Sequence, residues 1–374
     1  MEHDKRLFCL DVLRGLDMIL LLLVGRLVRA AQGCWQCFSP SFMGQFRHGW
    51  ECFTLWDIIM PLFIFMCGAA IPFALERRLK EGKSAFWRHV LSRVALLWFL
   101  GCVCQGNLAD LDPQTFSPYS NTLQAIATGY LVTAAMMAVG SRWLSFLLPV
   151  VLAGAYTVLL AVGGDYTQYG NFAFKVDHAI LSALLPTGNL HTKLASPNMY
   201  TWFLTSMMFA VMTLCGYQAT GILRSSRTHW KKAVGLSAYG FALVAVGGVA
   251  SVWIPIIKPI FTLSFTALAM GCCVLALGVL YALTDVFRLR RGLGLVLLFG
   301  RFSLVAYMVG CFFDPVLDSL VKTVGAGIVR VSGTSGGFVE AALASVALVL
   351  VLVAWKRMVL VKWGGKKCQA RLVG

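Results

Sequence analysis

Residues 46–61 read FRHGWECFTLWDIIMP and pass from a polar loop into a long apolar run without a break. His48 lies in the polar part, and Asp57 stands where the apolar part begins. Trp50 follows His48 by two residues, and Trp56 directly precedes Asp57. Tryptophan is enriched where a membrane-spanning helix meets the water interface. This stretch therefore predicts a transmembrane helix that begins beside a histidine and an aspartate.

The whole chain is also rich in hydrophobic residues and poor in charged ones. Of its 374 residues 59% are hydrophobic and only 13% are charged, and the mean hydropathy is +0.76. Soluble domains carry about 25% charged residues. Apolar runs long enough to cross a bilayer recur along the chain, without the short alternating segments of a membrane barrel. We therefore expect an all-α, polytopic membrane protein.

The apolar runs predict about ten or eleven transmembrane helices. Their expected bounds are 8–31, 56–76, 88–106, 122–140, 143–163, 200–220, 233–253, 259–283, 292–313 and 338–361. Lys and Arg gather at the N-terminus, in the loops near 77–93, 224–232 and 288–291, and in the C-terminal tail. By the positive-inside rule, both termini are expected in the cytoplasm.

The net charge of +16 fits this topology better than it fits a nucleic-acid partner, and we expect the lipid bilayer as the partner instead. The N-terminus leads directly into a span that contains charges, with no small-residue cleavage site, so no cleavable signal peptide is expected.

The twelve cysteines do not form the pattern of a disulfide framework, because most of them lie in apolar runs. Cys34 and Cys37 are different, since both fall in a loop. A local structural role is favoured for this pair over redox chemistry. No spacing of His and Cys indicates a metal site.

Ionisable residues inside predicted spans are candidates for function. Asp11, Arg14 and Asp17 follow one another at steps of three and can share one helix face, on which both acids could pair with Arg14. This cluster indicates either an internal salt-bridge group or a polar lining for an anionic ligand. Arg301, in the predicted span 292–313, could join either arrangement.

Asp57 and His48 are the candidates for chemistry at the outer side. Asp57 can cap its helix, where its charge suits the helix dipole, or it can orient a catalytic histidine. A histidine beside a helix mouth can take a proton near neutral pH. His178 and His191, in the large outer loop 164–199, are secondary candidates.

The outer loops also carry residues that suit a sugar. Residues 119–121 read YSN and residues 165–169 read DYTQY, which mix amide, hydroxyl and aromatic groups. Ordinary membrane-surface loops have a similar composition. The sequence contains no P-loop, dinucleotide fingerprint or serine elbow, and no internal repeat supports an inverted-repeat transporter.

Five segments resemble the transmembrane acyltransferase superfamily, in the same order along the chain. They match the bacterial branch of the heparan-α-glucosaminide N-acetyltransferase-like group. LDVLRGLDM at 10–18 resembles the family's LDVFRG opening, and the stretch 48–68 resembles its segment with a histidine, a tryptophan and TxxDLxFPxFxF. NTLQAIA at 121–127, NFAFKVD at 171–177 and IKPIFTLSF at 257–265 are similar to three further family segments.

This resemblance implies a single transmembrane acyltransferase domain over residues 1–374, acting as an acetyl-CoA:glycan acetyltransferase. Acetyl-CoA would bind from the cytoplasm and its acetyl group would pass to a sugar on the outer side. His48 would be the catalytic base or acyl carrier, with Asp57 orienting it. The donor would contact Arg14, Asp17, Asn121, Gln124 and Arg301. The acceptor would contact Trp50, Glu51, Asp177 and His178, and no metal is implied.

The chain departs from the family pattern at several places. The spacing from histidine to tryptophan is one residue shorter, and Cys52 replaces a glycine. Ala125 replaces an arginine, and Gly25 replaces an asparagine. The acceptor sugar therefore does not carry over.

The expected location is a bacterial inner membrane, with the acceptor on the periplasmic side. A homodimer is one expected partner state. The alternative from another class is a sugar or sugar-lipid permease, with Asp11, Arg14, Asp17 and Arg301 lining its pathway.

Overall fold

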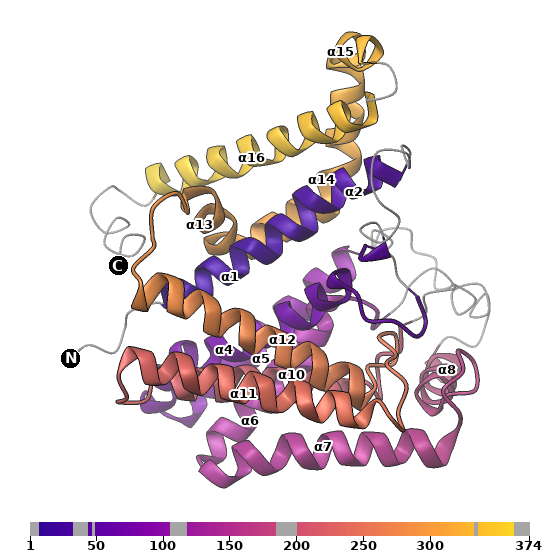
Figure 1. The fold of residues 1–374 in the computed structure, drawn as a ribbon, viewed down its shortest axis with the longest axis vertical. Coiled ribbons are helices and arrows are strands. Elements are labelled where there is room, and N and C mark those ends of the chain that lie inside the picture. The colour runs from indigo at the N-terminus through magenta and orange to yellow at the C-terminus, as the bar shows by residue number, and fades with distance from the viewer. Residues whose placement is uncertain are drawn as a thin grey trace. The chain divides into compact units, whose positions relative to one another are not determined.

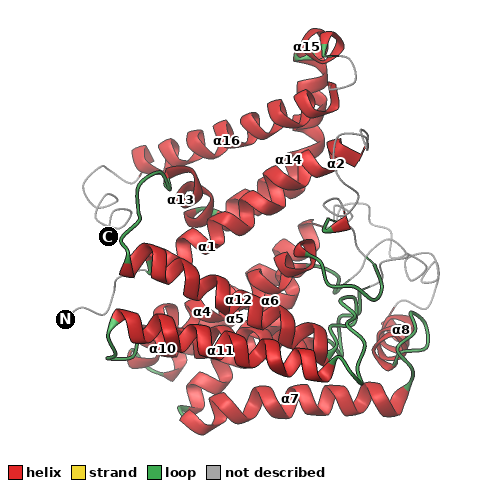
Figure 2. Cartoon of the chain, viewed as in Figure 1, coloured by secondary structure: helices red, strands yellow, loops and turns green. Residues whose placement is uncertain are grey.

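The computed structural model describes residues 7–32, 44–46, 49–104, 118–184, 200–332 and 336–362. These residues form helices and connecting turns, and the only β-type pairing among them is an isolated bridge between Glu51 and Ile257. Figure 1 and Figure 2 show the same all-helical architecture. The predicted fold class is confirmed for the described residues.

Eight helical runs in the described part are long and apolar enough to cross a membrane. They are Leu55–Lys80, Lys83–Cys104, Thr122–Val139, Arg142–Gly163, Ser206–Leu223, His229–Ala250, Leu263–Val286 and Gly336–Val359. Each overlaps one of the expected spans. The lengths and the composition of these helices fit an integral membrane protein. The total of ten or eleven spans and the side of each terminus stay predictions.

Two expected spans have a broken helix. The first contains α1 (Phe8–Ile19), a π-helical turn η1 (Leu20–Val24) and α2 (Gly25–Gln32) in direct succession. The ninth is divided into α13 (Gly294–Arg301) and α14 (Ser303–Val324), and the chain bends by 80° at Phe302. A break of this kind allows a broken span or a re-entrant segment.

The chain divides into two compact units. Unit 1 contains Met1–Phe46 and Leu283–Gly374, and unit 2 contains Arg47–Ala282. In unit 1, α13 packs against α1 at very short range. A Cβ on Gly15 would meet the Val296 carbonyl oxygen at 1.9 Å, and one on Gly300 would meet the Asp11 carbonyl oxygen at 1.9 Å. The two glycines thus allow the two backbones to touch.

The rest of unit 1 is built by the C-terminal helices. These are α14, the short α15 (Ala326–Val331) and α16 (Gly336–Lys362), and α16 packs against α14, α15 and α2. The apolar window of α16 is mostly exposed, as expected for a helix that faces lipid.

Unit 2 has four mostly buried inner helices and three mostly exposed outer ones. The inner helices are α4 (Ile59–Lys80, preceded by the 3-10 turn η3, Leu55–Ile58), α6 (Thr122–Val139), α10 (Ser206–Leu223) and α12 (Leu263–Tyr281). The outer helices are α5 (Lys83–Cys104), α7 (Arg142–Gly163) and α11 (His229–Ala250), and α8 (Phe172–Leu184) is a shorter helix between α7 and α10.

The inner helices α4 and α10 touch along their backbones. A Cβ on Gly68 would meet the Thr213 carbonyl oxygen at 1.9 Å, and one on Gly216 would meet the Phe65 carbonyl oxygen at 2.0 Å. α6 joins this contact, since the Thr133 and Thr213 hydroxyls lie 2.8 Å apart. Small residues and hydroxyls therefore hold the centre of unit 2 together.

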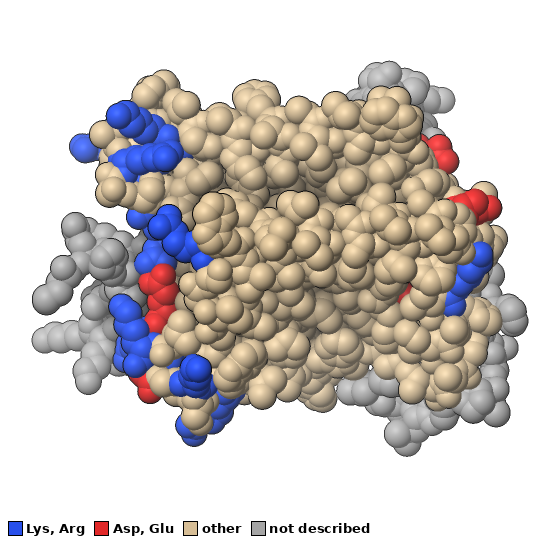
Figure 3. Space-filling view, turned by 90° about the horizontal axis from the view of Figure 1, so that it is seen from below, with Lys and Arg blue, Asp and Glu red and all other residues tan. Residues whose placement is uncertain are grey.

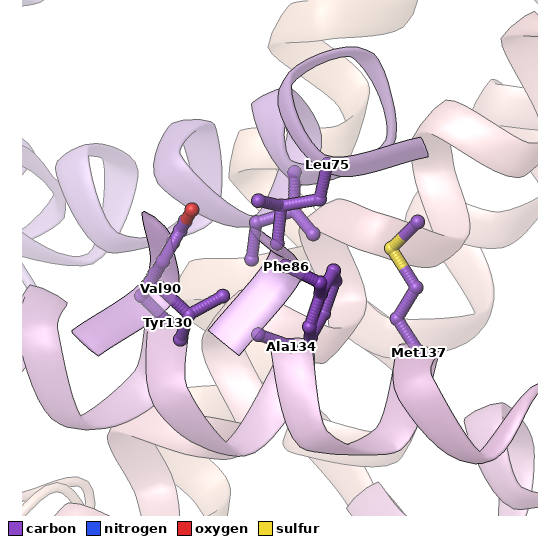
Figure 4. Packing of buried hydrophobic residues seen from close by; sticks show 7 residues of the cluster. Leu75, Phe86, Val90, Tyr130, Ala134 and Met137 are labelled. Carbon is purple, nitrogen blue, oxygen red and sulfur yellow. The ribbon is translucent and has the colours of Figure 1, made fainter. Parts of the chain in front are cut away.

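The core between α4, α5 and α6 is apolar. Figure 4 shows side chains from all three helices in this cluster. Its buried members are Ile71, Leu75, Phe86, Val90, Tyr130, Ala134 and Met137.

The inner helices of unit 2 run in the same direction, so the unit has two distinct ends. Glu76 and Arg224 form a salt bridge between the C-terminal ends of α4 and α10, where Arg77, Arg78 and Lys80 also lie. We name this the basic end. The N-termini of α4, α6, α10 and α12 lie at the opposite end, which we name the polar end. On the face drawn in Figure 3, Lys and Arg lie at the edges and the broad middle is uncharged.

Candidate functional site

Asp57 lies at the polar end, on the turn that starts α4, and its side chain is buried. Its Oδ2 accepts hydrogen bonds from the Thr54 backbone N–H at 2.9 Å and from the Thr54 hydroxyl at 2.7 Å. Thr54 and Asp57 form a capping box, with Thr54 as the N-cap. The capping interpretation of Asp57 is thus correct, although Asp57 occupies the third position of the box.

The other carboxylate oxygen of Asp57 is bound by a lysine. Lys258 Nζ donates to Asp57 Oδ1 at 3.1 Å, and both side chains are buried. The Lys258 ammonium also lies 5.9 Å from the centre of the Tyr200 ring, within cation–π range. Burial lowers the pKa of Lys258, and the nearby Asp57 carboxylate opposes this shift.

Sequence reasoning missed Lys258 as a site residue. A signal was present, because Lys258 is the only cation between the expected spans 233–253 and 259–283 and lies in a segment that resembles the acyltransferase family. Its partner could not be read from the sequence, since 201 positions separate the two residues.

Lys258 is carried by a tight turn before α12. The Phe261 N–H donates to the Lys258 carbonyl at 2.9 Å, and the Ile257 N–H donates to the Thr262 hydroxyl at 3.1 Å. Phe261 has a φ of 44°, in the left-handed region that a side chain with Cβ adopts at a cost. This turn delays the start of α12 to Leu263, four residues after the expected start of the span.

Cys52 lies beside the ion pair. Its thiol donates to Asp57 Oδ2 at 3.7 Å, and the Gly49 N–H donates to its sulfur at 3.1 Å. Burial and the Asp57 carboxylate raise the pKa of the Cys52 thiol. Cys52 therefore contacts the buried Asp57 carboxylate at the polar end.

Trp50 and Glu51 anchor the segment that follows His48. The Trp50 indole N–H donates to the Tyr166 carbonyl at 3.0 Å, and Glu51 forms the isolated bridge with Ile257. The chain from Gly49 to Asp57 is thereby attached to the loop after α7 and to the turn before α12. His48 itself, like His191, Cys34 and Cys37, lies outside the described residues.

Asn121 and Gln124 form a second capping box, at the start of α6. Asn121 Oδ1 accepts from the Leu123 N–H at 2.9 Å. Gln124 is fully buried, and its Oε1 accepts from the backbone N–H groups of Ser120 and Asn121. Its Nε2 donates to the Pro118 carbonyl and the Cys102 sulfur. Gln124 is one of the residues predicted to contact acetyl-CoA. In the structure its side-chain amide holds the loop before α6.

Asp177 and His178 lie on α8. The buried Asp177 carboxylate accepts from the Trp202 N–H at 2.6 Å and the Phe203 N–H at 3.1 Å. Burial raises the pKa of Asp177 to about 7 despite these bonds. The half-buried His178 lies 3.4 Å from the Ser182 hydroxyl through its Nδ1. Asp177 thus attaches α8 to the chain before α10.

The remaining residues that were predicted to contact acetyl-CoA lie in unit 1. Arg14 pairs with Asp11 at 3.4 Å. Asp17 is 1% exposed, and neither of its carboxylate oxygens has a hydrogen-bond partner among the described residues. The expected pairing of Asp17 with Arg14 is therefore wrong. Arg301 ends α13, and its Nε also has no hydrogen-bond partner in the described part.

The predicted residues thus fall into two groups. Asp57, Asn121, Gln124, Trp50, Glu51, Asp177 and His178 come together at the polar end of unit 2, whereas Arg14, Asp17 and Arg301 belong to unit 1. Among the described residues, no group of three or more His, Cys, Asp and Glu side chains could hold a metal ion.

Residues 6–105 match a family model described as a domain of unknown function, DUF5009. The matched part runs from α1 to the end of α5 and includes Asp17, Cys52 and Asp57. No curated protein matches the chain.

Proposed function

We propose that the chain is a membrane acyltransferase that moves an acetyl group from cytoplasmic acetyl-CoA to a sugar on the outer side of the membrane. The observation that carries the proposal is the buried Lys258–Asp57 pair at the polar end of unit 2. It joins the turn before α12 to the helix start that closely follows His48. Buried ion pairs are expensive in a membrane protein and mark functional sites.

The two ends of unit 2 suit the two substrates. The basic end presents arginines and lysines to the phosphates of acetyl-CoA. The polar end presents amide, hydroxyl and aromatic groups to a carbohydrate. In a bacterial cell the membrane would be the inner membrane, and the acceptor would lie in the periplasm.

In the proposed transfer, the thioester C–S bond of acetyl-CoA breaks and a C–N or C–O bond to the sugar forms. His48 takes the proton from the attacking amine or hydroxyl and returns it to the CoA thiolate. In the two-step form, His48 carries the acetyl group between the two substrates. Asp57 and Lys258 act as positioning residues, because they fix the chain that follows His48.

A transfer assay tests this function. The full chain, purified in detergent, is incubated with labelled acetyl-CoA and a panel of amino and neutral sugars. We expect the label on one sugar class, and we expect His48→Ala to abolish transfer without lowering the melting temperature. His229→Gln, at the start of α11, is the matched histidine control and should retain transfer. Normal turnover by a folded His48→Ala protein would overturn the role of His48.

A permease is the second candidate, and Asp17 favours it. A buried carboxylate without a hydrogen-bond partner among the described residues is typical of a transport pathway or proton relay. A ligand that binds only the folded protein must stabilise it. A rise in melting temperature with acetyl-CoA supports the enzyme. Sugar uptake into vesicles that contain the protein, with no such rise, supports the permease.

A further inference from the structure

Arg93 is a charged residue at a core-facing position of α5. The buried positions of this helix are Phe86, Val90, Leu97, Gly101 and Cys102. Arg93 continues the stripe that they form, three residues after Val90 and four before Leu97, and it is half-buried. α5 packs against α6 along this side. An ionisable residue inside a predicted span is costly and is therefore a candidate for function.

The partner of Arg93 across the helix contact is Tyr130 of α6. The Arg93 guanidinium lies 5.0 Å from the centre of the Tyr130 ring, in cation–π geometry. The ring holds the guanidinium plane but leaves its N–H donors available for hydrogen bonds. Within the described residues Arg93 makes no ion pair, so its charge is not neutralised there.

The Tyr130 hydroxyl is the second unused group. Tyr130 is 1% exposed, and its hydroxyl has no hydrogen-bond partner among the described residues. In Figure 4 the hydroxyl oxygen points away from Leu75, Ala134 and Met137. Buried hydroxyls are nearly always hydrogen-bonded in native proteins, so an unbonded one beside a free guanidinium indicates a missing partner.

We propose that Arg93 and the Tyr130 hydroxyl bind a phosphate group of the acyl donor between α5 and α6. A guanidinium offers the fork of donors that phosphate prefers, and the hydroxyl adds one more. This inference rests on the proposed function. It adds a contact between acetyl-CoA and unit 2 that the sequence did not indicate.

The depth of Arg93 fits a phosphate rather than the thioester. α5 starts at the basic end with Lys83, and Arg93 lies ten residues later, about 15 Å along the helix. From Arg93 to the polar end, α5 continues for about 17 Å. An extended pantetheine arm can cross that distance. A phosphate held at Arg93 therefore allows the acetyl group to reach the polar end.

A binding titration on the full chain in detergent tests the site, with acetyl-CoA and with phosphate-free S-acetylpantetheine. Arg93→Gln should weaken acetyl-CoA binding by at least about tenfold, since it removes charge-assisted hydrogen bonds. It should leave S-acetylpantetheine binding unchanged. Tyr130→Phe should weaken acetyl-CoA binding by about threefold to tenfold, and its melting temperature should not fall, because no hydrogen bond is lost.

Arg88→Gln is the matched control, since Arg88 is an exposed arginine of the same helix. It should weaken binding by about twofold at most, because solvent and salt screen its charge. Equal effects of Arg88→Gln and Arg93→Gln, or equal losses for both ligands, would overturn the site. So would a titration in which Arg93→Gln weakens only the binding of phosphatidylglycerol, which would assign the site to lipid. A wild-type protein that binds neither donor would overturn the proposed function and this site together.

Discussion

Lys258 Nζ lies 3.1 Å from Asp57 Oδ1 in a buried contact that joins two turns 201 positions apart in the chain. One turn starts α4 and the other precedes α12. The pair therefore links the start of α4 to the turn before α12 at the polar end of unit 2. Its removal has a measurable consequence for stability.

Lys258→Met should lower the free energy of unfolding by about 3–5 kcal/mol, because it leaves the Asp57 carboxylate buried without its cation. The double variant Asp57→Asn with Lys258→Met should recover a large part of this loss. Unfolding in detergent measures both. Arg78→Gln, which breaks an exposed pair with Glu81 at 2.8 Å, should change little. Strictly additive losses in the double variant would show that the two residues act independently.

The Cys52 thiol should react slowly with iodoacetamide at pH 8, because burial and the Asp57 carboxylate raise its pKa. Asp57→Asn removes the charge that opposes the thiolate, so the pKa of Cys52 should fall and alkylation should become faster. Site-resolved mass spectrometry separates Cys52 from the other cysteines. An unchanged rate in a folded Asp57→Asn protein would contradict the contact between the two side chains.

The stability that Asp177 contributes should depend on pH. Its pKa is raised from 3.8 to about 7 in the folded protein, so the folded state holds the proton more tightly than the unfolded state. The resulting stabilisation is complete below about pH 4 and is lost as the pH rises through 7. We therefore expect the melting temperature of the wild type, relative to Asp177→Asn, to fall between about pH 4 and pH 7 and to level off above that range. Asp165→Asn, in an exposed loop, should show no such trend.

Gly68→Ala should prevent the normal packing of α4 on α10, because the new Cβ would meet the Thr213 carbonyl oxygen at 1.9 Å. We expect loss of folded protein in size-exclusion chromatography and in thermal unfolding. Gly221→Ala, in the partner helix α10, adds a Cβ that meets nothing within 4 Å, and it should be neutral or stabilising by up to about 1 kcal/mol. Similar behaviour of the two variants would exclude a tight helix contact at Gly68.

The apolar helices were predictable because their signal is local. Run length and composition located the eight apolar helices, and the position of Asp57 at the start of an apolar run indicated a helix cap. The break at Phe302 was not predictable, since no proline marks it. Likewise, the π-helical turn at Leu20–Val24 lies in a run of leucines that suits any helix.

The candidate site was only partly predictable, because pairing across the chain leaves no local pattern. The lysine that binds Asp57 sits in a turn held by Phe261 at positive φ, where sequence reasoning would look for glycine. The resemblance indicates Gln124 as a contact of the acyl donor and Asp177 as a contact of the acceptor. Their amide and carboxylate are, however, committed to backbone N–H groups of neighbouring loops. The charge pattern places Arg93 with the basic loop near residues 77–93, whereas its spacing from Val90 and Leu97 puts it on the core-facing stripe of α5.

The backbone contact between α4 and α10 also constrains how the protein is made. The ribosome completes α4 more than a hundred residues before α10 emerges. Until then Gly68 has no Thr213 carbonyl to cover it, and the groove it forms must be filled by lipid or by an insertion factor. During synthesis α4 is therefore in the membrane before its packing partner is present, so α4 and α10 should pack together late in assembly.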